Sequence, residues 1–84
     1  MKNYNYLGKS NGKKFCIQGI DVFSHKWKSL GECDIVLQPD TKKPYSFSVY
    51  EIETDSRVVK FLAGKFDDDD WAFFADRKEE DYIF

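Results

Sequence analysis

Residues 45–75 hold most of the large apolar residues of the chain, and the polar segments 54–56 and 67–70 divide them into what we predict to be three consecutive antiparallel strands. The middle strand is apolar on both faces, so we expect it to be central in a sheet. The three predicted strands are Tyr45–Glu53, Arg57–Phe66 and Trp71–Ala75, with a tight turn at 54–56 and an acidic loop at 67–70.

The length of the acidic loop predicts the register of the last two strands. If the four aspartates Asp67–Asp70 form the whole loop, Phe66 faces Trp71 and Gly64 faces Phe73 on one side of the sheet. A large ring lies well over a residue that has no side chain. The same reasoning at the upstream turn sets Ile52 opposite Val58.

The dipeptide Asn11-Gly12 predicts a hairpin near the N-terminus. Asn-Gly between alternating segments favours a tight turn, because both turn residues need positive φ. Strands Tyr4–Gly8 and Lys13–Gly19 would then pair with each other and place Gly8 opposite Phe15.

A short helix is predicted over residues 21–30, because apolar residues follow one helical face there. Asp21 would cap its start and Gly31 would follow its end. The competing interpretation is an irregular or extended crossing, since several residues in this segment are moderate helix formers. The residues on the apolar face are Ile20, Phe23, Trp27 and Leu30.

Glu32–Gln38 is typical of a strand, and the proline-bracketed loop 39–44 connects it as a hairpin to Tyr45–Glu53. Within Tyr45–Glu53 the apolar positions change from odd to even, which indicates either a bulge or burial on both faces. The predicted fold is mainly β: a small curved antiparallel sheet or partly open barrel of five to six strands with one short helix. We expect a single domain, 1–84, whose acidic segment 76–84 either packs back or is flexible.

Composition limits the size of the core and the cellular compartment that we expect for the protein. A domain of 84 residues buries only about 60–65% of its unfolded surface, and aromatic residues at 18% compensate for the thin core. No apolar segment reaches the length of a membrane span, and residues 1–14 lack the apolar region of a secretory signal. We expect a cytoplasmic protein with reduced thiols at Cys16 and Cys33; one disulfide in an exported protein is the alternative.

The net charge of −2 conceals an asymmetry along the chain. Residues 1–31 hold six lysines and one aspartate, whereas residues 67–84 hold eight acids against Arg77 and Lys78. Either the two ends neutralise each other in the fold, or an acidic edge docks on a basic partner.

Few residues of the sequence suggest a catalytic or metal-binding site. His25 and Cys33 form a conceivable nucleophilic pair, but no third orienting group or cleft is indicated, so we expect no enzymatic activity. No C-x-x-C or H-x₃-H spacing supports zinc, and the run Asp67–Asp70 lacks the layout of a calcium loop. We expect no metal and no cofactor.

The leading hypothesis is a non-enzymatic protein–protein interaction domain that binds a basic protein through its acidic C-terminal third. Charge would steer the partner and aromatic residues would supply most of the binding energy. An inhibitor or immunity-type protein is one form of this hypothesis, and a homodimer through a sheet edge is another. The candidate contacts are Asp67, Asp68, Asp69, Asp70 and Trp71, with Tyr82 and Phe84 as apolar anchors.

The alternative hypothesis is single-stranded nucleic-acid binding by the N-terminal hairpin, which combines lysines with rings that can stack on bases. A sequence pI of about 5.3 disfavours phosphate binding. The residues that would form this surface are Tyr4, Tyr6, Lys9, Lys13, Lys14, Phe15 and Trp27.

Overall fold

The fold is mainly β, as the sequence predicts. The computed structural model describes residues 4–75, so the predicted contacts of Tyr82 and Phe84 and the expectation for segment 76–84 lie outside the described residues. The elements are β1 (Tyr6–Ser10), β2 (Cys16–Ile17), β3 (Ile20–Asp21), the 3₁₀ turn η1 (Val22–Ser24), β4 (Lys28–Leu37), β5 (Pro44–Glu53), β6 (Val58–Lys65) and β7 (Trp71–Ala75).

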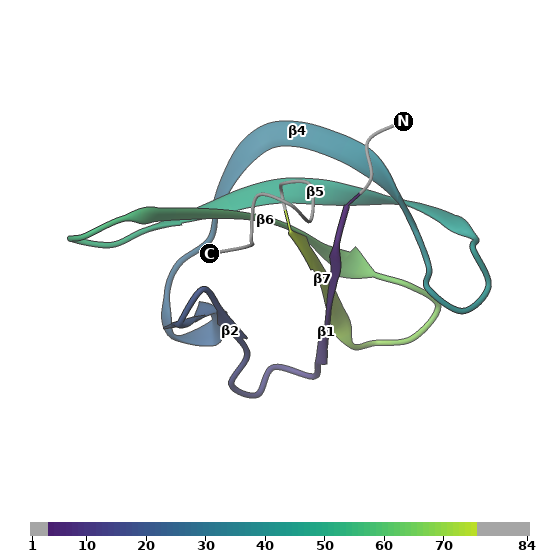
Figure 1. Cartoon of the computed structure of the whole chain (residues 1–84), viewed down its shortest axis with the longest axis horizontal. Coiled ribbons are helices and arrows are strands. Elements are labelled where there is room, and N and C mark those ends of the chain that lie inside the picture. Colours follow the sequence, from purple (N-terminus) through teal and green to yellow (C-terminus); the bar gives the residue numbers. More distant parts are fainter. Residues whose placement is uncertain (1–3, 76–84) are drawn as a thin grey trace.

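Five strands form one antiparallel sheet in the order β1-β7-β6-β5-β4, and β2 and β3 form a separate two-stranded ribbon. The prediction that the strand after residue 57 is central is confirmed, because β6 is the middle strand. In Figure 1, β4, β5 and β6 run across the view whereas β7 and β1 run steeply, so the sheet is strongly curved. The sheet does not close into a barrel, but the Tyr4 hydroxyl donates a hydrogen bond to Asp34 on β4 at 2.5 Å and so connects its two margins.

The predicted pairing of β6 with β7 is confirmed, but its register is wrong by one residue. Lys65, not Phe66, lies opposite Trp71, and the loop therefore runs over five residues, 66–70. A slip of one residue moves side chains to the other face of a sheet. Phe66 and Trp71 consequently lie on opposite sides: Phe66 belongs to one buried cluster and Trp71 packs against the other.

The β5–β6 turn shows the same error. Ile52 lies opposite Val59 rather than Val58, because the turn has one more residue than predicted. The Thr54 N–H donates to the Arg57 carbonyl at 2.9 Å and closes this longer turn. Gly64 does lie under a ring, but the ring is that of Phe47: a Cβ atom at Gly64 would meet it at 2.7 Å.

The predicted N-terminal hairpin is wrong. β1 pairs with β7, with Gly8 opposite Phe73 and Ser10 opposite Trp71, while β2 pairs with β3. The physical reason is the burial of β7, in which Ala72–Ala75 are all buried. Such a strand needs hydrogen-bonded neighbours on both edges, and β1 supplies the second one.

The predicted helix is also wrong, and the extended crossing is found instead. Only Val22–Ser24 form a single 3₁₀ turn, and the chain is extended again at His25. Asp21 does cap this turn, since its Oδ1 accepts the Phe23 N–H at 3.1 Å. Gly31 lies inside β4 with φ of +73°, where the register between β4 and β5 shifts.

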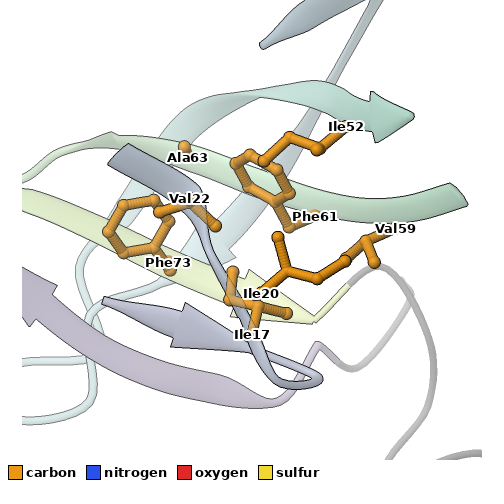
Figure 2. Close-up of a cluster of buried hydrophobic side chains, with 8 residues drawn as sticks. All are labelled: Ile17, Ile20, Val22, Ile52, Val59, Phe61, Ala63 and Phe73. Atoms are coloured by element: carbon orange, nitrogen blue, oxygen red, sulfur yellow. The ribbon is translucent and has the colours of Figure 1, made fainter. Parts of the chain in front are cut away.

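The hairpin from β4 to β5 is confirmed, with β4 beginning earlier than predicted. The change of parity within β5 reflects burial on both faces, because Phe47 and Ile52 belong to different clusters. The first cluster consists of Ile17, Ile20, Val22, Ile52, Val59, Phe61, Ala63 and Phe73. The second cluster consists of Val36, Phe47, Val49, Leu62, Phe66, Ala72 and Phe74. Figure 2 shows the first cluster, with residues of the β2–β3 ribbon facing those of the sheet.

Candidate functional site

One face of the sheet, here called the capped face, carries the first cluster and is covered over only part of its area. The cover is the segment 15–27, here called the cap. Phe15 stacks on Phe73 with ring centroids 4.5 Å apart, and Trp27 lies edge-on to Phe61 at 5.3 Å and to Phe73 at 5.7 Å. Asp21 stabilises the turn within the cap, because its Oδ1 accepts hydrogen bonds from both the Phe15 and the Phe23 N–H groups.

The strand register shows where this cover ends. One row across the sheet joins Cys33, Ser48, Ala63 and Phe73, each opposite the next. Ala63 and Phe73 in this row are buried beneath the cap, while Cys33 is exposed. The boundary of the cap therefore crosses the sheet between β6 and β4.

Beyond that boundary lies an uncovered surface, which we call the open strip. Ile35 and Leu37 are 41% and 39% exposed there, although they share a strand with the buried Val36. Their partners on β5 are Ser46 and Pro44, so no large side chain covers them from the neighbouring strand. The open strip consists of Cys33, Ile35 and Leu37 on β4 with Ser46 and Ser48 on β5.

The same three β4 residues direct backbone groups to the free edge of the sheet. The Gln38 N–H donates to the Lys43 carbonyl at 2.9 Å, so this pair is a hydrogen-bonded one, and hydrogen-bonded pairs alternate along an antiparallel ladder. Leu37, Ile35 and Cys33 then occupy the intervening positions, whose N–H and C=O groups point away from β5. Pro44, which has no N–H, faces Leu37 at a position that needs none.

One of these outward N–H groups is already occupied. The Ile35 N–H donates to Asp34 Oδ1 at 2.8 Å, while Oδ2 of the same carboxylate accepts from Tyr4. Asp34 therefore lies on the edge itself and brings a carboxylate close to the open strip.

The other edge of the sheet, β1, is differently built. It is five residues long, its register with β7 shifts between Tyr6 and Gly8, and Lys9 forms an ion pair with Asp68. A short, bulged edge that carries a lysine resists pairing with further strands. Of the two edges, only β4 offers a regular stretch with exposed apolar side chains.

The acidic loop lies between these two margins and is partly neutralised by the chain itself. Lys9 holds the pKa of Asp68 below its usual value, and Asp68 in turn raises the pKa of Lys9. Lys43, from the β4–β5 loop, lies 3.5 Å from Asp67. The predicted docking residues thus include two carboxylates with intramolecular partners, whereas Asp69 is exposed and makes none of the ion pairs found within residues 4–75.

Tyr45 contributes to the electrostatics of this loop. Its hydroxyl is buried and has no hydrogen bond of regular geometry within the described residues. It nonetheless lies close enough to Asp67 to be the main cause, ahead of Lys43, of the lowered pKa of that carboxyl group.

Trp71 is the member of the predicted site that contacts the capped face. Its ring lies 5.1 Å from that of Trp27, and the Lys65 ammonium lies 5.1 Å from its centroid. Trp71 therefore joins the cap to the acidic loop rather than standing alone as an anchor. The sequence does not mark Ile35 and Leu37 as a site, because they form a continuous apolar run with Val36 and only the fold shows which of the three are exposed.

The rings expected to stack on nucleic-acid bases are used inside the protein. Tyr4 and Tyr6 pack against the second cluster, and Phe15 and Trp27 pack against the first. Every aromatic side chain between residues 4 and 75 is at least partly buried.

Reactive side chains do not converge in the described part of the chain. His25 Nδ1 lies 3.0 Å from the Asp21 carbonyl, and Cys33 contacts Ser48 Oγ at 3.9 Å. Cys16 and Cys33 are both exposed and form no disulfide. Residues 4–75 contain no cluster of histidine, cysteine and acidic side chains suited to a metal ion, and no helix able to cross a membrane.

Comparison of the chain with protein-family models, with characterised proteins and with solved structures finds no match.

Proposed function

We propose that the protein is a non-enzymatic protein-binding domain whose contact surface is the open strip together with the neighbouring acidic loop. The observation that carries the proposal is the incomplete cover of the capped face. In a domain whose core is thin, Ile35 and Leu37 remain exposed on a sheet face that is elsewhere covered by rings. A surface of this kind is typical of a binding site when polar and charged residues surround it.

The acidic loop adds charge at the margin of the same face. Lys43 joins the end of the β4–β5 hairpin to Asp67, so the loop lies beside the end of the open strip. Asp69 and Asp70 are the loop carboxylates outside the ion pairs with Lys9 and Lys43. They would steer a basic partner and raise its association rate at low salt.

The test is capture of partners from native lysate with the immobilised wild-type protein and with the double variant Ile35→Thr, Leu37→Thr. A stoichiometric partner of the wild type should be lost by the double variant, with affinity reduced at least tenfold (about 1.4 kcal/mol) because two apolar contacts are removed. The matched control is Val58→Thr, which changes another exposed aliphatic residue, at the start of β6. Equal capture by all three proteins would overturn the proposal.

A second comparison tests the contribution of the loop. The variant Asp69→Asn, Asp70→Asn should bind the partner more slowly at low salt and differ little from wild type at high salt. An equal deficit at both salt concentrations would contradict electrostatic steering by these carboxylates.

A further inference from the structure

We infer that the partner binds as an extended, basic segment that adds a sixth strand to the main sheet along β4. This inference rests on the proposed function and specifies its geometry. It depends on three features of one short stretch, Cys33–Leu37: the outward backbone groups, the alternating apolar side chains, and the surrounding negative charge.

The backbone groups provide the first feature. Cys33, Ile35 and Leu37 direct their N–H and C=O groups to the free edge, as the ladder from Gln38 to β5 shows. An added strand forms hydrogen bonds with every second residue of the edge strand, which is the spacing of these three residues. At Ile35 the incoming strand would replace the contact that Asp34 Oδ1 now makes with the N–H.

The side chains provide the second feature. Ile35 and Leu37 stand two residues apart on the same face of the sheet and are both exposed. An extended segment beside β4 would place its own alternate side chains next to them. Apolar residues at those positions would bury the aliphatic surface of the open strip, and the intervening residues would lie on the other face near Asp34.

The charge around β4 favours a basic segment of another protein over a second copy of this chain as the added strand. Glu32 and Asp34 lie on β4, Asp40 lies in the loop that follows it, and the ion pair of Lys43 with Asp67 brings the acidic loop beside that loop. Of the lysines in the same region, Lys9 and Lys43 bind Asp68 and Asp67, and Lys65 lies over Trp71. Lys42 is exposed and makes none of the ion pairs found within residues 4–75, so the acidic side chains still outnumber the lysines without a partner. Two copies joined at β4 would bring like charges together, whereas a segment rich in lysine or arginine complements them.

The experiment is an NMR titration of the ¹⁵N-labelled protein with a capped synthetic peptide of alternating lysine and valine residues. We expect resonance shifts over Cys33–Leu37 and slower hydrogen exchange at Cys33 and Leu37, at least tenfold, with binding that weakens as salt is raised. Two control peptides keep the length. The first has glutamate in place of lysine. The second keeps the lysine–valine sequence but carries a methyl group on the backbone nitrogen of each valine, so that these nitrogens cannot donate hydrogen bonds to β4.

The protein variants Leu37→Pro and Leu37→Ala form a matched pair. Both shorten the side chain, but only proline removes the outward N–H, and proline is tolerated at such edge positions. Peptide binding should be weaker in Leu37→Pro than in Leu37→Ala. If Leu37→Pro does not give a folded spectrum, the methylated peptide makes the same distinction on the wild-type protein.

Each result has a definite meaning. Loss of binding with the methylated and glutamate peptides supports strand addition by a basic segment. Equal binding of the methylated peptide, shifts confined to 67–70, no binding of the lysine–valine peptide, or concentration-dependent self-association through β4 would overturn it. If the lysine–valine peptide does not bind but the Ile35→Thr, Leu37→Thr variant loses its lysate partner, only the strand-addition geometry is wrong. If the peptide does not bind and the variant also keeps the partner, the proposed function is wrong as well.

Discussion

The capped face of the sheet has two halves that differ in what covers them. Over the half nearest β6 and β7, the cap buries Phe61 and Phe73 completely. Over the half formed by β4 and the start of β5, Ile35 and Leu37 remain exposed beside serines. The same face thus serves stability at one end and is available for contact at the other. Substitutions in the covered half should therefore lower the stability of the fold, whereas substitutions in the open strip should weaken binding.

Phe73→Ala should produce the largest loss of stability. The side chain is fully buried, stacks on Phe15 and contacts Phe23 and Trp27, so its removal leaves a cavity in the covered half. The expected loss is about 3–5 kcal/mol of the free energy of unfolding, measured by urea denaturation. Because a small domain can unfold at such a loss, Phe73→Leu serves as the milder second variant. A loss below about 1 kcal/mol for Phe73→Ala would mean that the cap does not pack as described.

Trp27→Ala should come next. The indole is only half-buried, but it contacts rings on three strands of the sheet and donates its Nε1–H to the Val22 carbonyl at 2.7 Å. We expect a loss of about 2–3 kcal/mol. Trp27→Phe keeps much of the packing and loses the hydrogen bond, so it should cost about 1 kcal/mol. Equal effects of the two variants would show that the hydrogen bond, not the ring contacts, holds the cap.

Asp21→Ala should weaken the cap without touching the sheet. One carboxylate oxygen accepts two backbone N–H groups, from Phe15 and Phe23, each at 3.1 Å. The expected loss is about 1–2 kcal/mol. Asp21→Asn retains an acceptor oxygen and should lose clearly less. If both variants were as stable as wild type by urea denaturation, the turn would not depend on this side chain.

A smaller, pH-dependent effect is expected at the acidic loop. The pKa values of Asp67 and Asp68 are lowered in the folded state, by Tyr45 with Lys43 and by Lys9 respectively. Their stabilising contribution is therefore present above the unfolded pKa of about 3.9 and is lost as the pH falls through the folded values. The wild type should exceed the Asp67→Asn, Asp68→Asn variant in unfolding free energy at neutral pH, and the gap should shrink below about pH 4. A gap that widens on acidification would contradict this.

The strands from residue 45 to residue 75 were predictable because apolar segments are separated there by short polar turns, but the registers were not. In both hairpins one residue of the loop was assigned to a strand, Phe66 in one and Arg57 in the other. The side chain of Phe66 is apolar and buried whether it ends the strand or begins the loop, so local pattern alone does not locate the boundary.

Long-range pairing was the other limit. The Asn-Gly signal near residue 12 favours a local hairpin, yet β1 pairs with β7 at the far end of the chain. The helix-like spacing of Ile20, Phe23 and Trp27 arises because a single turn and an extended segment direct all three toward the first cluster. Ile35 and Leu37 become a candidate site only once the order of the strands and the extent of the cap are known, and neither is a local property.

The open strip, in our proposal, serves binding and not stability. The most direct measurement compares the Ile35→Thr, Leu37→Thr variant with wild type in both unfolding free energy and recovery of a stoichiometric partner. We expect the two unfolding free energies to lie within about 0.5 kcal/mol of each other, and the variant to lose the partner. A variant that keeps the partner, or that loses stability as Trp27→Ala does, would contradict it.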